Sequence, residues 1–461
     1  MDASNLFAQN FQDVKYEDFS EKAVEETKKQ VLDLIGVATA GFGQGGAAET
    51  RELAIEWGGA PQSTIIGTKV KVPAPAAAQV NASMTHSLDF DDVHEAAIMH
   101  PGVVTIPTAL AVGEYAGKLS GKDLIKAVVV GGDMICRMGL ATHPGKDIHQ
   151  FGWHFTSING YMTAAAVASW VMGLDVERAV YAMGIAYHQS SGNGQAVKDG
   201  ALTKRLGPGF AVRGGITSAM LAQKGVTGAT NAMEGVNGYY KVYHGNDYSR
   251  DALVGDLGKR FESENTSIKP YPCCRGTHPS ADAALALVRE HGIEADDVEG
   301  INIFCGKGTL ELLGEPLDYK AKPRNVVDSQ FSLAWVACSG IVKKRVSLAS
   351  FTPDAIKDPE ILRLAAKVKI TYEPKYDTGG LEPIRIEVSL KNGKILSVER
   401  LTATGSPENP VTYDECVEKF YGCVDYSSYP MTRANADAIV ETVKALEKMG
   451  DISELMKLLA W

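Results

Sequence analysis

Apolar residues recur at helical spacing along the chain as far as about residue 265. The clearest pattern runs from Glu17 to about Ala40, where apolar side chains return every three or four positions and Ser20 is a candidate N-cap. Several later segments are rich in Ala and Gly, and small residues let helices approach closely. This region is predicted to be all-helical, with further helices at about residues 74–88, 105–117, 121–142, 156–172, 175–190 and 210–223.

The pattern changes after Lys269. The segment PIRIEVSLKNGKILSVERL alternates apolar and polar residues on both sides of Asn392-Gly393, a pair typical of β-hairpin turns. The same region contains the strand patterns VEGINIFCG and VKITYEP, and helical patterns at about 279–291 and from Ser329. These segments together predict an α+β unit.

Helical patterns return from about Thr412, so the C-terminal segment is predicted to pack on the first helical region. We therefore expect a mainly α protein, in which a large all-helical domain carries an inserted, smaller α+β lid domain. The expected boundaries are residues 1–267 plus 403–461 for the helical domain and 268–402 for the lid. The cleft between two such domains is a natural substrate pocket.

Composition narrows the class of protein. The formal net charge is -10 and the sequence has no dense Lys/Arg cluster, so nucleic acid is not expected as a partner. The seven cysteines lack paired CxxC spacing, which favours reduced thiols in the cytoplasm over disulfides or structural zinc. Apolar runs are too short to span a membrane, and the N-terminus does not look like a signal peptide.

The segment GFGQGG, residues 41–46, matches the dinucleotide-binding pattern GxGxxG, but it follows a helix rather than a strand. That pattern means little outside a strand-turn-helix context, so a glycine-rich loop is expected here and NAD is not. The sequence also has no Walker motif, HExxH or GxSxG. No cofactor is therefore expected.

The stretch SLDFDDVHEAAIMHPG, residues 87–102, is the first candidate site. A metal site would combine Asp91 or Asp92 with His94 and His100, but the spacing matches no common divalent site. Alternatively, Asp92 and Glu95 cap and solvate a helix end, which leaves His100 unexplained. We favour a proton-transfer site without metal.

A second cluster lies in HPGKDIHQFGWHFTSINGY. His154 stands between Trp153 and Phe155, just before an Ala-rich helix, so its side chain is predicted to face an interior or a pocket mouth. A histidine beside aromatic residues is also a common core residue. His143 and His149 are expected at the surface.

Two lysines complete the candidate set. Lys204 is expected in a loop, with the next helix beginning after Pro208, and the simpler alternative for it is a loop salt bridge. Lys269 precedes Arg275 and His278 in the proline-rich segment SIKPYPCCRGTHPSADA at the predicted domain boundary. A stiff basic segment beside a cleft suits carboxylate recognition.

With DFDDVHEAAIMHPG, GWHFTSINGYMTAAAVASWVMGLD, LTKRLGPGFAVRGG and KPYPCCRGTHPSADA in this order, the chain resembles the MmgE/PrpD family. That family includes 2-methylcitrate dehydratases, cis-aconitate decarboxylases and iminodisuccinate epimerase. The resemblance spans nearly the whole chain but does not choose among these activities. It implies a helical domain with an inserted α+β lid, a homodimer, and catalysis without metal or organic cofactor.

The resemblance also implies a pocket made by five residues, Asp89, His100, His154, Lys204 and Lys269. Two features differ from the decarboxylases. Their acidic run continues into a threonine and HPS, where this chain has Val93 and HPG, and the tyrosine of their lid has no clear counterpart. We therefore predict a cofactor-free lyase of the 2-methylcitrate dehydratase type, acting on a small di- or tricarboxylate. A dicarboxylate epimerase ranks second, a cis-aconitate-type decarboxylase third and a noncatalytic carboxylate-binding protein last.

The activities of the family can share one step, proton transfer at a carbon next to a carboxylate. This step needs a base with a pKa near neutrality and fixed cations for the growing enolate charge. We expect His154 or His100 to move the proton and Asp89 to orient a histidine, while in a dehydration the other histidine, protonated, helps the hydroxyl leave as water. The predicted substrate-binding residues are Lys204, Lys269, Arg275, His278 and Asp92.

Overall fold

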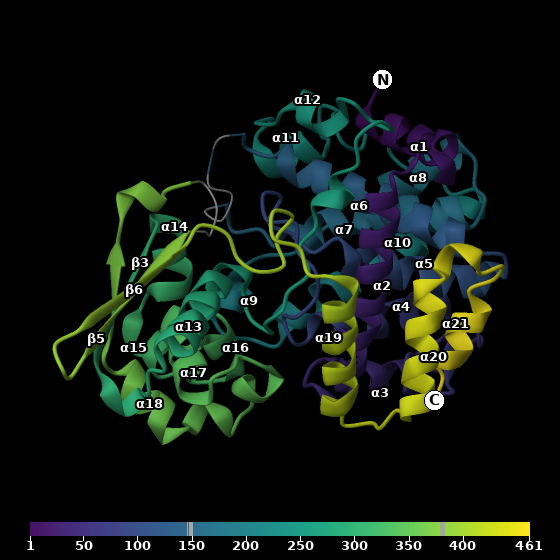
Figure 1. Ribbon diagram of the computed structural model, residues 1–461. Helices are drawn as coiled ribbons and strands as arrows, with labels where there is room; N and C mark the ends of the chain where they lie inside the picture. The colour runs from purple at the N-terminus through teal and green to yellow at the C-terminus, as the bar shows by residue number, and fades with distance from the viewer. Residues whose placement is uncertain (145, 147–150, 379–382) are drawn as a thin grey trace.

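A computed structural model describes residues 1–144, 146, 151–378 and 383–461, and these form two bodies that lie side by side (Figure 1). The larger body is helical and holds both termini. Its helices before the lid are α1 (Ala3–Asp13), α2 (Glu21–Ala40), α3 (Ala47–Trp57), α4 (Ala74–His86), α5 (Gly102–Ala116), α6 (Gly121–Leu140), α7 (Phe155–Val171), α8 (Val176–Tyr187), α9 (Gln195–Lys198), α10 (Thr203–Gln223), α11 (Tyr239–His244) and α12 (Arg250–Val254).

Helix α2 shows how local signals set an element. Ser20 is its N-cap, as predicted, and the Ser20 hydroxyl accepts the backbone N–H of Ala23 at 2.9 Å. The helix begins at Glu21 rather than Glu17, because residues Tyr16–Asp18 form a separate 3-10 turn. Fifteen of its twenty residues are buried, so α2 lies inside the helical body rather than on its surface.

The prediction that a helix begins after Pro208 is wrong. Helix α10 begins at Thr203, so Pro208 lies inside it and Lys204 belongs to its first turn rather than to a loop. A proline inside a helix removes one backbone hydrogen bond. Close packing against α7 and α4 compensates here, since a Cβ at Gly207 would overlap Ser157 Oγ and one at Gly209 would overlap Ser83 Oγ.

The helical body also contains one short β-pair that the sequence did not predict. Strands β1 (Ser63–Thr64) and β2 (Lys71–Val72) pair antiparallel. Two residues per strand are too few for an alternating pattern to be recognised. No helix in the described part of the chain has the length and apolar composition needed to cross a bilayer.

The smaller body is built around a four-stranded mixed sheet in the order β4-β3-β5-β6. Strand β3 pairs parallel with β4 and antiparallel with β5, which forms the predicted hairpin with β6. Gly393 takes the left-handed conformation, φ 86°, that the hairpin turn requires. The elements are α13 (His278–His291), β3 (Val298–Cys305), α14 (Lys307–Thr309), α15 (Leu317–Ala321), α16 (Val326–Gln330), α17 (Leu333–Lys343), α18 (Pro359–Ala365), β4 (Val368–Tyr372), β5 (Ile384–Leu390) and β6 (Ile395–Arg400).

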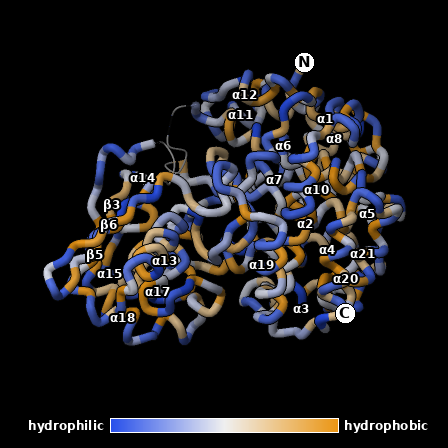
Figure 2. Tube along the Cα trace, viewed as in Figure 1, coloured by the Kyte–Doolittle hydropathy of each residue, from blue (hydrophilic) through white to orange (hydrophobic). Residues whose placement is uncertain are grey.

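After the sheet the chain returns to the helical body as α19 (Tyr413–Tyr426), α20 (Arg433–Lys444) and α21 (Ser453–Leu458), and α19 and α20 pack against α2 (Figure 1). Each body has its own hydrophobic core, and apolar segments gather inside both (Figure 2). The main core of the helical body draws on residues up to 268 and from 411 onward, and the core of the smaller body on residues 273 to 398. The predicted fold class, mainly α with an inserted α+β unit, is therefore confirmed.

Candidate functional site

The acidic stretch forms the connection between α4 and α5. Asp89 has a left-handed backbone, φ 53°, which is uncommon for a residue other than glycine and turns the chain sharply after α4. The backbone N–H of His100 donates to Thr156 Oγ1 of α7 at 3.0 Å, and Val93 pairs with Ser267 across an isolated β-bridge. The connection is thus held against two distant parts of the chain.

Asp89 contacts both predicted lysines. The Lys204 ammonium donates to Asp89 Oδ1 at 2.6 Å, and Lys269 Nζ donates to the backbone carbonyl of Asp89 at 3.0 Å and lies 3.5 Å from Oδ1. Asp89 Oδ2 is buried and has no hydrogen-bond partner among the described residues. Two ammonium groups thus surround one carboxylate, an arrangement suited to a second, substrate carboxylate.

The charges of neighbouring residues keep Asp89 and Lys269 ionised. Burial alone would raise the pKa of Asp89, but Lys204 and Lys269 outweigh burial and hold that pKa well below its usual value. Burial likewise works to lower the pKa of Lys269, yet the attraction of Asp89 and Asp91 raises it overall. Lys269 therefore remains a cation although its side chain is only 1% exposed.

Three histidines lie beside Asp89 and its two lysines. The His86 ring is in the middle, with ring centroids 4.8 Å from His100 and 5.7 Å from His154. His86 Nδ1 is 2.7 Å from Asp91 Oδ2, and His154 Nδ1 is 2.7 Å from Ser157 Oγ. The structure therefore joins the two predicted histidines through a third, His86.

The contacts of His100 define its tautomer. Its Nδ1 lies 2.5 Å from the backbone carbonyl of Asp92, which can only accept, so Nδ1 carries the proton. Nε2 is then the basic nitrogen. Asp91 Oδ2 lies 3.4 Å from the same Nδ1, so His100 and His86 face one buried carboxylate.

Burial keeps all three histidines neutral. Burial is the largest influence that lowers the pKa of His154 to about 3, with His86 and Lys204 adding to it. It also puts the pKa values of His86 and His100 well below the usual value, although Asp91 opposes the shift at His100. In the free protein the three imidazoles are therefore neutral at pH 7, and their pKa values lie below the near-neutral value expected for the catalytic base.

His86 was not among the site residues predicted from the sequence. It is the last residue of α4 and immediately precedes the acidic stretch, three positions before Asp89. A histidine at that position on the helix is the signal that could have identified it. The structure also places the carboxylate of Asp89 against lysines, whereas the carboxylate that contacts a histidine is that of Asp91.

The acid Asp92 caps a helix. Both of its carboxylate oxygens accept the backbone N–H of Gly102, the first residue of α5, at 3.1 and 3.0 Å. Burial, Asp91 and Asp33 raise its pKa well above the usual value. The helix-capping alternative considered for Asp92 thus has a direct geometric basis.

Arg275 and His278 lie together at the junction of the two bodies. Arg275 Nε donates to Glu95 Oε1 at 2.7 Å, and its Nη1 donates to the carbonyl of Thr404 at 2.8 Å and lies 3.1 Å from His278 Nδ1. Glu95, expected to cap or solvate a helix end, instead accepts from Arg275 and from the hydroxyl of Ser267. Substrate binding by Arg275 and His278 stays a prediction.

Other histidines have local partners. His94 Nδ1 accepts the backbone N–H of Ala97, and its Nε2 lies 3.5 Å from Glu262. The surface position expected for His143 is wrong, because it stacks on Phe151 at 3.6 Å and is only 5% exposed. His149, also expected at the surface, lies outside the described residues.

His86, Asp91 and His100 are also the group that could hold a metal ion. One ligand atom from each lies within 4.8 Å of the others, and a two-histidine, one-carboxylate set suits a divalent transition metal. Of the metal ligands considered from the sequence, Asp91 and His100 thus belong to this group. The same atoms make the contacts described above, which position protons, so the group also fits proton transfer.

Two cavities among the described residues can be compared with this site. One, of about 650 Å³, lies between α9 and the helices α15 and α16 of the smaller body, which is the predicted lid. Phe331 lies in the wall of this cavity, and its ring centroid is 5.6 Å from Lys204 Nζ. Tyr319 of α15 also lines it, so a lid tyrosine does reach this cavity. The cavity therefore adjoins Lys204, one of the two lysines that contact Asp89.

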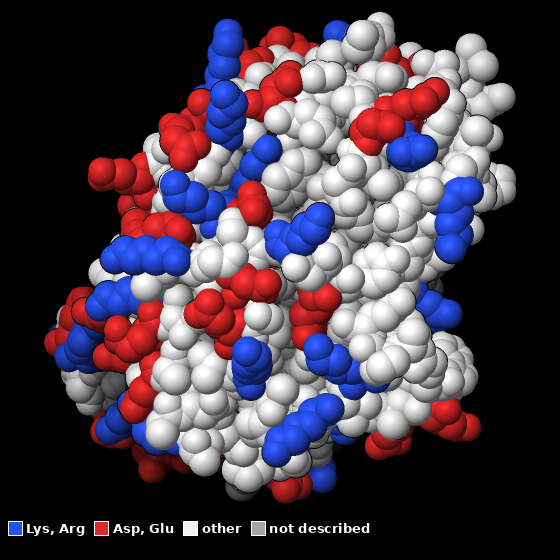
Figure 3. Space-filling model, turned by 90° about the vertical axis from the view of Figure 1, so that its right-hand side faces the viewer, with Lys and Arg blue, Asp and Glu red and all other residues white. Residues whose placement is uncertain are grey.

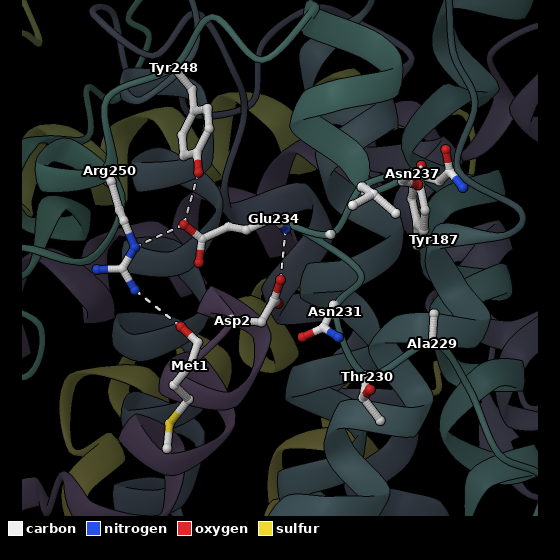
Figure 4. A pocket seen from close by; sticks show the side chains of 13 residues that line it. Met1, Asp2, Tyr187, Ala229, Thr230, Asn231, Glu234, Asn237, Tyr248 and Arg250 are labelled. Atoms are coloured by element: carbon white, nitrogen blue, oxygen red, sulfur yellow. Dashed lines mark hydrogen bonds and ion pairs between the residues drawn. The ribbon is translucent and has the colours of Figure 1, made fainter.

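The other cavity, of about 990 Å³, lies at the N-terminus (Figure 4). The Glu234 carboxylate there accepts from Arg250 and Tyr248 at 2.9 Å each, and from the backbone N–H of Ala3 at 2.8 Å. None of the described residues that line it is a histidine or a lysine. This cavity has no described contact with the histidines or lysines around Asp89, whereas the smaller cavity adjoins Lys204 through Phe331, so the smaller cavity is the one beside the candidate site.

Known protein families match both parts of the chain. The MmgE/PrpD N-terminal domain model matches residues 5–251 and the MmgE/PrpD C-terminal domain model matches residues 271–446. The chain therefore belongs to the MmgE/PrpD family, as its four motifs predicted, and is an enzyme of that family that acts on a carboxylate.

Three curated relatives extend over most of the chain. The cis-aconitate decarboxylase-like protein oryM of Aspergillus oryzae is 28% identical over 86% of this chain and 84% of its own length. The cis-aconitate decarboxylases of Mus musculus and Homo sapiens are each 26% identical over 98% of this chain, and over 92% and 93% of their own lengths. The chain is thus similar to lyases at a low level of identity.

Proposed function

We propose that this protein is a cofactor-free lyase that removes a proton from a carbon next to a carboxylate of a di- or tricarboxylate, and that the reaction is a dehydration of the 2-methylcitrate type. The observation that carries the proposal is the contact between Lys204, Lys269 and Asp89 beside three neutral histidines. Enolate formation requires cations for the growing charge and a base whose pKa lies near neutrality, and a bound polyanionic substrate raises the pKa of these histidines toward that value.

In this mechanism the two lysines bind a substrate carboxylate and stabilise the charge that grows on it as the C–H bond breaks. His100 Nε2 takes the proton, because its Nδ1 is held as a donor by the Asp92 carbonyl. Asp89 keeps both ammonium groups in place, and Asp91 fixes His86 between the other two rings.

Loss of water also requires a proton donor, which we assign to His154. Its pKa of about 3 leaves it neutral in the free protein. A polyanionic substrate brings negative charge close to the ring, and negative charge raises a histidine pKa. His154 thus becomes an acid only when substrate is bound, which couples protonation to binding.

Two other reactions use the same groups. Decarboxylation is supported by the names of the relatives and by Tyr319, a lid tyrosine in the wall of the neighbouring cavity. Epimerisation of a dicarboxylate is supported by two histidines that could serve the two faces of one carbon, His100 and His154. A noncatalytic carboxylate-binding role would require the lysines but would not require the three histidines.

Proton NMR in D₂O separates these reactions. The protein is mixed with 2-methylcitrate, citrate, cis-aconitate or iminodisuccinate in separate tubes. We expect loss of water from 2-methylcitrate or citrate. Loss of carbon dioxide from cis-aconitate would instead assign decarboxylation, and deuterium exchange without net loss would assign epimerisation. No change in any tube at high protein concentration would contradict the proposal for these acids.

We also propose a homodimer, which the family resemblance supports. On the face shown in Figure 3, acidic and basic side chains crowd one side, whereas a broad area of the other side carries neither. In the helical body, Trp57 of α3 and Phe210 of α10 are 58% and 41% exposed, and Arg213 lies over the Trp57 ring at 5.3 Å. Interface cores are depleted in charge and rich in aromatic residues. Light scattering after gel filtration tests this, and a monomer would contradict it.

All seven cysteines lie within the described residues and are buried and unpaired. Free thiols fit the reducing cytoplasm predicted from their spacing, and we propose that compartment for the protein. Fractionation of the producing cells with a specific antibody tests this assignment.

A further inference from the structure

Apolar side chains line much of the cavity beside Lys204, between charged residues at its rim and wall. The apolar ones are Val197 of α9 on the helical side and Leu312, Leu317, Val327 and Phe331 on the other, and Lys198, Glu311 and Glu315 are among the charged ones. Its volume of about 650 Å³ lies well within the range of about 300–1,000 Å³ that is usual for sites that hold drug-sized ligands. That is more room than a six- or seven-carbon acid needs, above all when its carboxylates are bound by Lys204 and Lys269.

Two of the cations in its wall, Arg324 and Lys320, already have partners, whereas Lys198 is exposed. Arg324 donates to both carboxylate oxygens of Asp328, at 2.7 and 3.1 Å, and stacks on the Tyr319 ring at 4.2 Å. Lys320 Nζ donates to two backbone carbonyls, at 2.9 and 2.6 Å, and burial lowers the pKa of Lys320 to about 8. These contacts occupy Arg324 and Lys320, so the apolar side chains of the wall offer the surface that can hold hydrocarbon.

The cavity is directly linked to the carboxylate-binding group. Phe331 lies in its wall and also faces Lys204 Nζ, with the ring centroid 5.6 Å away. The preceding residue, Gln330, donates to the carbonyls of Leu88 and Pro272 at 2.6 and 3.1 Å. Leu88 is the neighbour of Asp89, so these hydrogen bonds hold the cavity wall and the carboxylate-binding group in one fixed arrangement.

We propose that the substrate carries an alkyl chain, or an apolar group of similar size, on its carboxylate-bearing core, and that this chain lies in the cavity between α9 and the lid helices α15 and α16. Phe331 lies where the chain leaves the carboxylate site. The inference rests on the proposed function, because it takes Lys204 and Lys269 as the groups that bind the carboxylates.

Calorimetric titration of the full-length protein with a series of 2-alkylsuccinates tests this. Succinate, 2-methylsuccinate, 2-butylsuccinate and 2-octylsuccinate share one dicarboxylate head and differ only in the chain. Burying a methylene favours binding by about three- to fourfold. We therefore expect affinity to rise by about this factor per methylene until the cavity is filled, and then to level off.

Substitutions that fill the cavity from opposite walls locate the chain. Val197→Trp and Leu317→Trp should each remove most of the advantage of 2-octylsuccinate and leave the affinity for succinate within about twofold. The matched control is Val226→Trp, which makes the same change at a position 43% exposed that does not line the cavity. This control should retain the full dependence on chain length. Using both walls protects the test against one variant that fails to fold.

The outcomes separate the inference from the proposed function. If succinate binds, Lys269→Ala removes that binding, and affinity does not depend on chain length, the inference is overturned and the proposed function stands. If chain length matters equally in both cavity-filling variants and in the wild type, the chain lies elsewhere and the inference is also overturned. If no member of the series binds, the carboxylate site itself is wrong, and both proposals fall.

Discussion

Asp91 Oδ2 lies 2.7 Å from His86 Nδ1, and both side chains are completely shielded from solvent. A carboxylate can only accept, so His86 carries its proton on Nδ1, and its Nε2 has no hydrogen-bond partner among the described residues. The pair fixes the ring that separates His100 from His154. Its role in the proposed mechanism is to position the two histidines that move protons.

We therefore expect His86→Gln to lower kcat by about 10²-fold with a small effect on KM, because misplacing a catalytic group by about 1 Å costs this much. Steady-state kinetics over a range of pH would measure both values. The matched control is His94→Gln, a buried histidine of the same connection that pairs with Glu262. A kcat for His86→Gln as high as that of this control would exclude the positioning role.

His154→Ala should reduce the rate by ~10²-fold or more, because general acid-base catalysis typically contributes at least this factor. The variant loses the hydrogen bond to Ser157 and the ring contact with His86, and it should remain folded, which circular dichroism would establish. His100→Ala should abolish both turnover and deuterium exchange into the substrate. His154→Ala should retain deuterium exchange, because in the proposed mechanism His154 acts only as the acid. Near-normal turnover would remove His154 from the mechanism.

Lys269→Ala should mainly weaken substrate binding and so raise KM. The Lys269 ammonium is 1% exposed and lies within 3.5 Å of Asp89, so its loss also leaves a buried carboxylate with one cation fewer. We expect a lower melting temperature in addition. Lys71→Ala, which removes a lysine that pairs with Glu114 at the surface, serves as the control for charge alone. A KM equal to that of wild type would refute the carboxylate clamp.

The sequence predicted the fold better than it predicted the contacts within the site. Helix α2 with its Ser20 cap and the hairpin at Gly393 follow from neighbouring residues, so local patterns identify them. The start of α10 was missed because packing against α7 and α4 outweighs the local effect of Pro208. Propensity is a weak guide wherever tertiary contacts decide.

The site depends on contacts between distant positions. Asp89 is 115 residues from Lys204 and 180 from Lys269 along the chain, so no local pattern could bring them together. The family resemblance placed those residues in one pocket, and the structure has the three in contact. The resemblance did not include His86, and the partnership of Asp91 with a histidine depends on the turn at Asp89.

Stability should fall as the pH is lowered from about 6.5 toward 4. Unfolded His154 takes up a proton near its ordinary pKa of 6.5, whereas the folded residue does so only near 3. Between these values the unfolded state binds more protons, so acid favours unfolding. The depressed pKa values of His86 and His100 act in the same direction.

Thermal unfolding at pH 7.5, 6 and 4.5 would measure this effect. His154→Gln should show a smaller decrease in melting temperature over that range than the wild type, since glutamine does not titrate. His291 is an exposed histidine outside this site, and His291→Gln provides the control. Equal slopes for all three proteins would show that His154 is not buried as a neutral base.

Chelation distinguishes proton transfer from metal catalysis at the same residues. In the proposed mechanism Asp91 accepts from His86 and His100 takes the proton, without a metal ion, so dialysis against EDTA should leave kcat unchanged. If these three residues instead hold a catalytic metal, EDTA should abolish activity, and a divalent ion such as Zn²⁺ should restore it. Metal analysis of the purified protein before and after dialysis provides a readout that does not depend on turnover. About one equivalent of tightly held metal that is lost together with activity would replace the proton-transfer mechanism with a metal-dependent one.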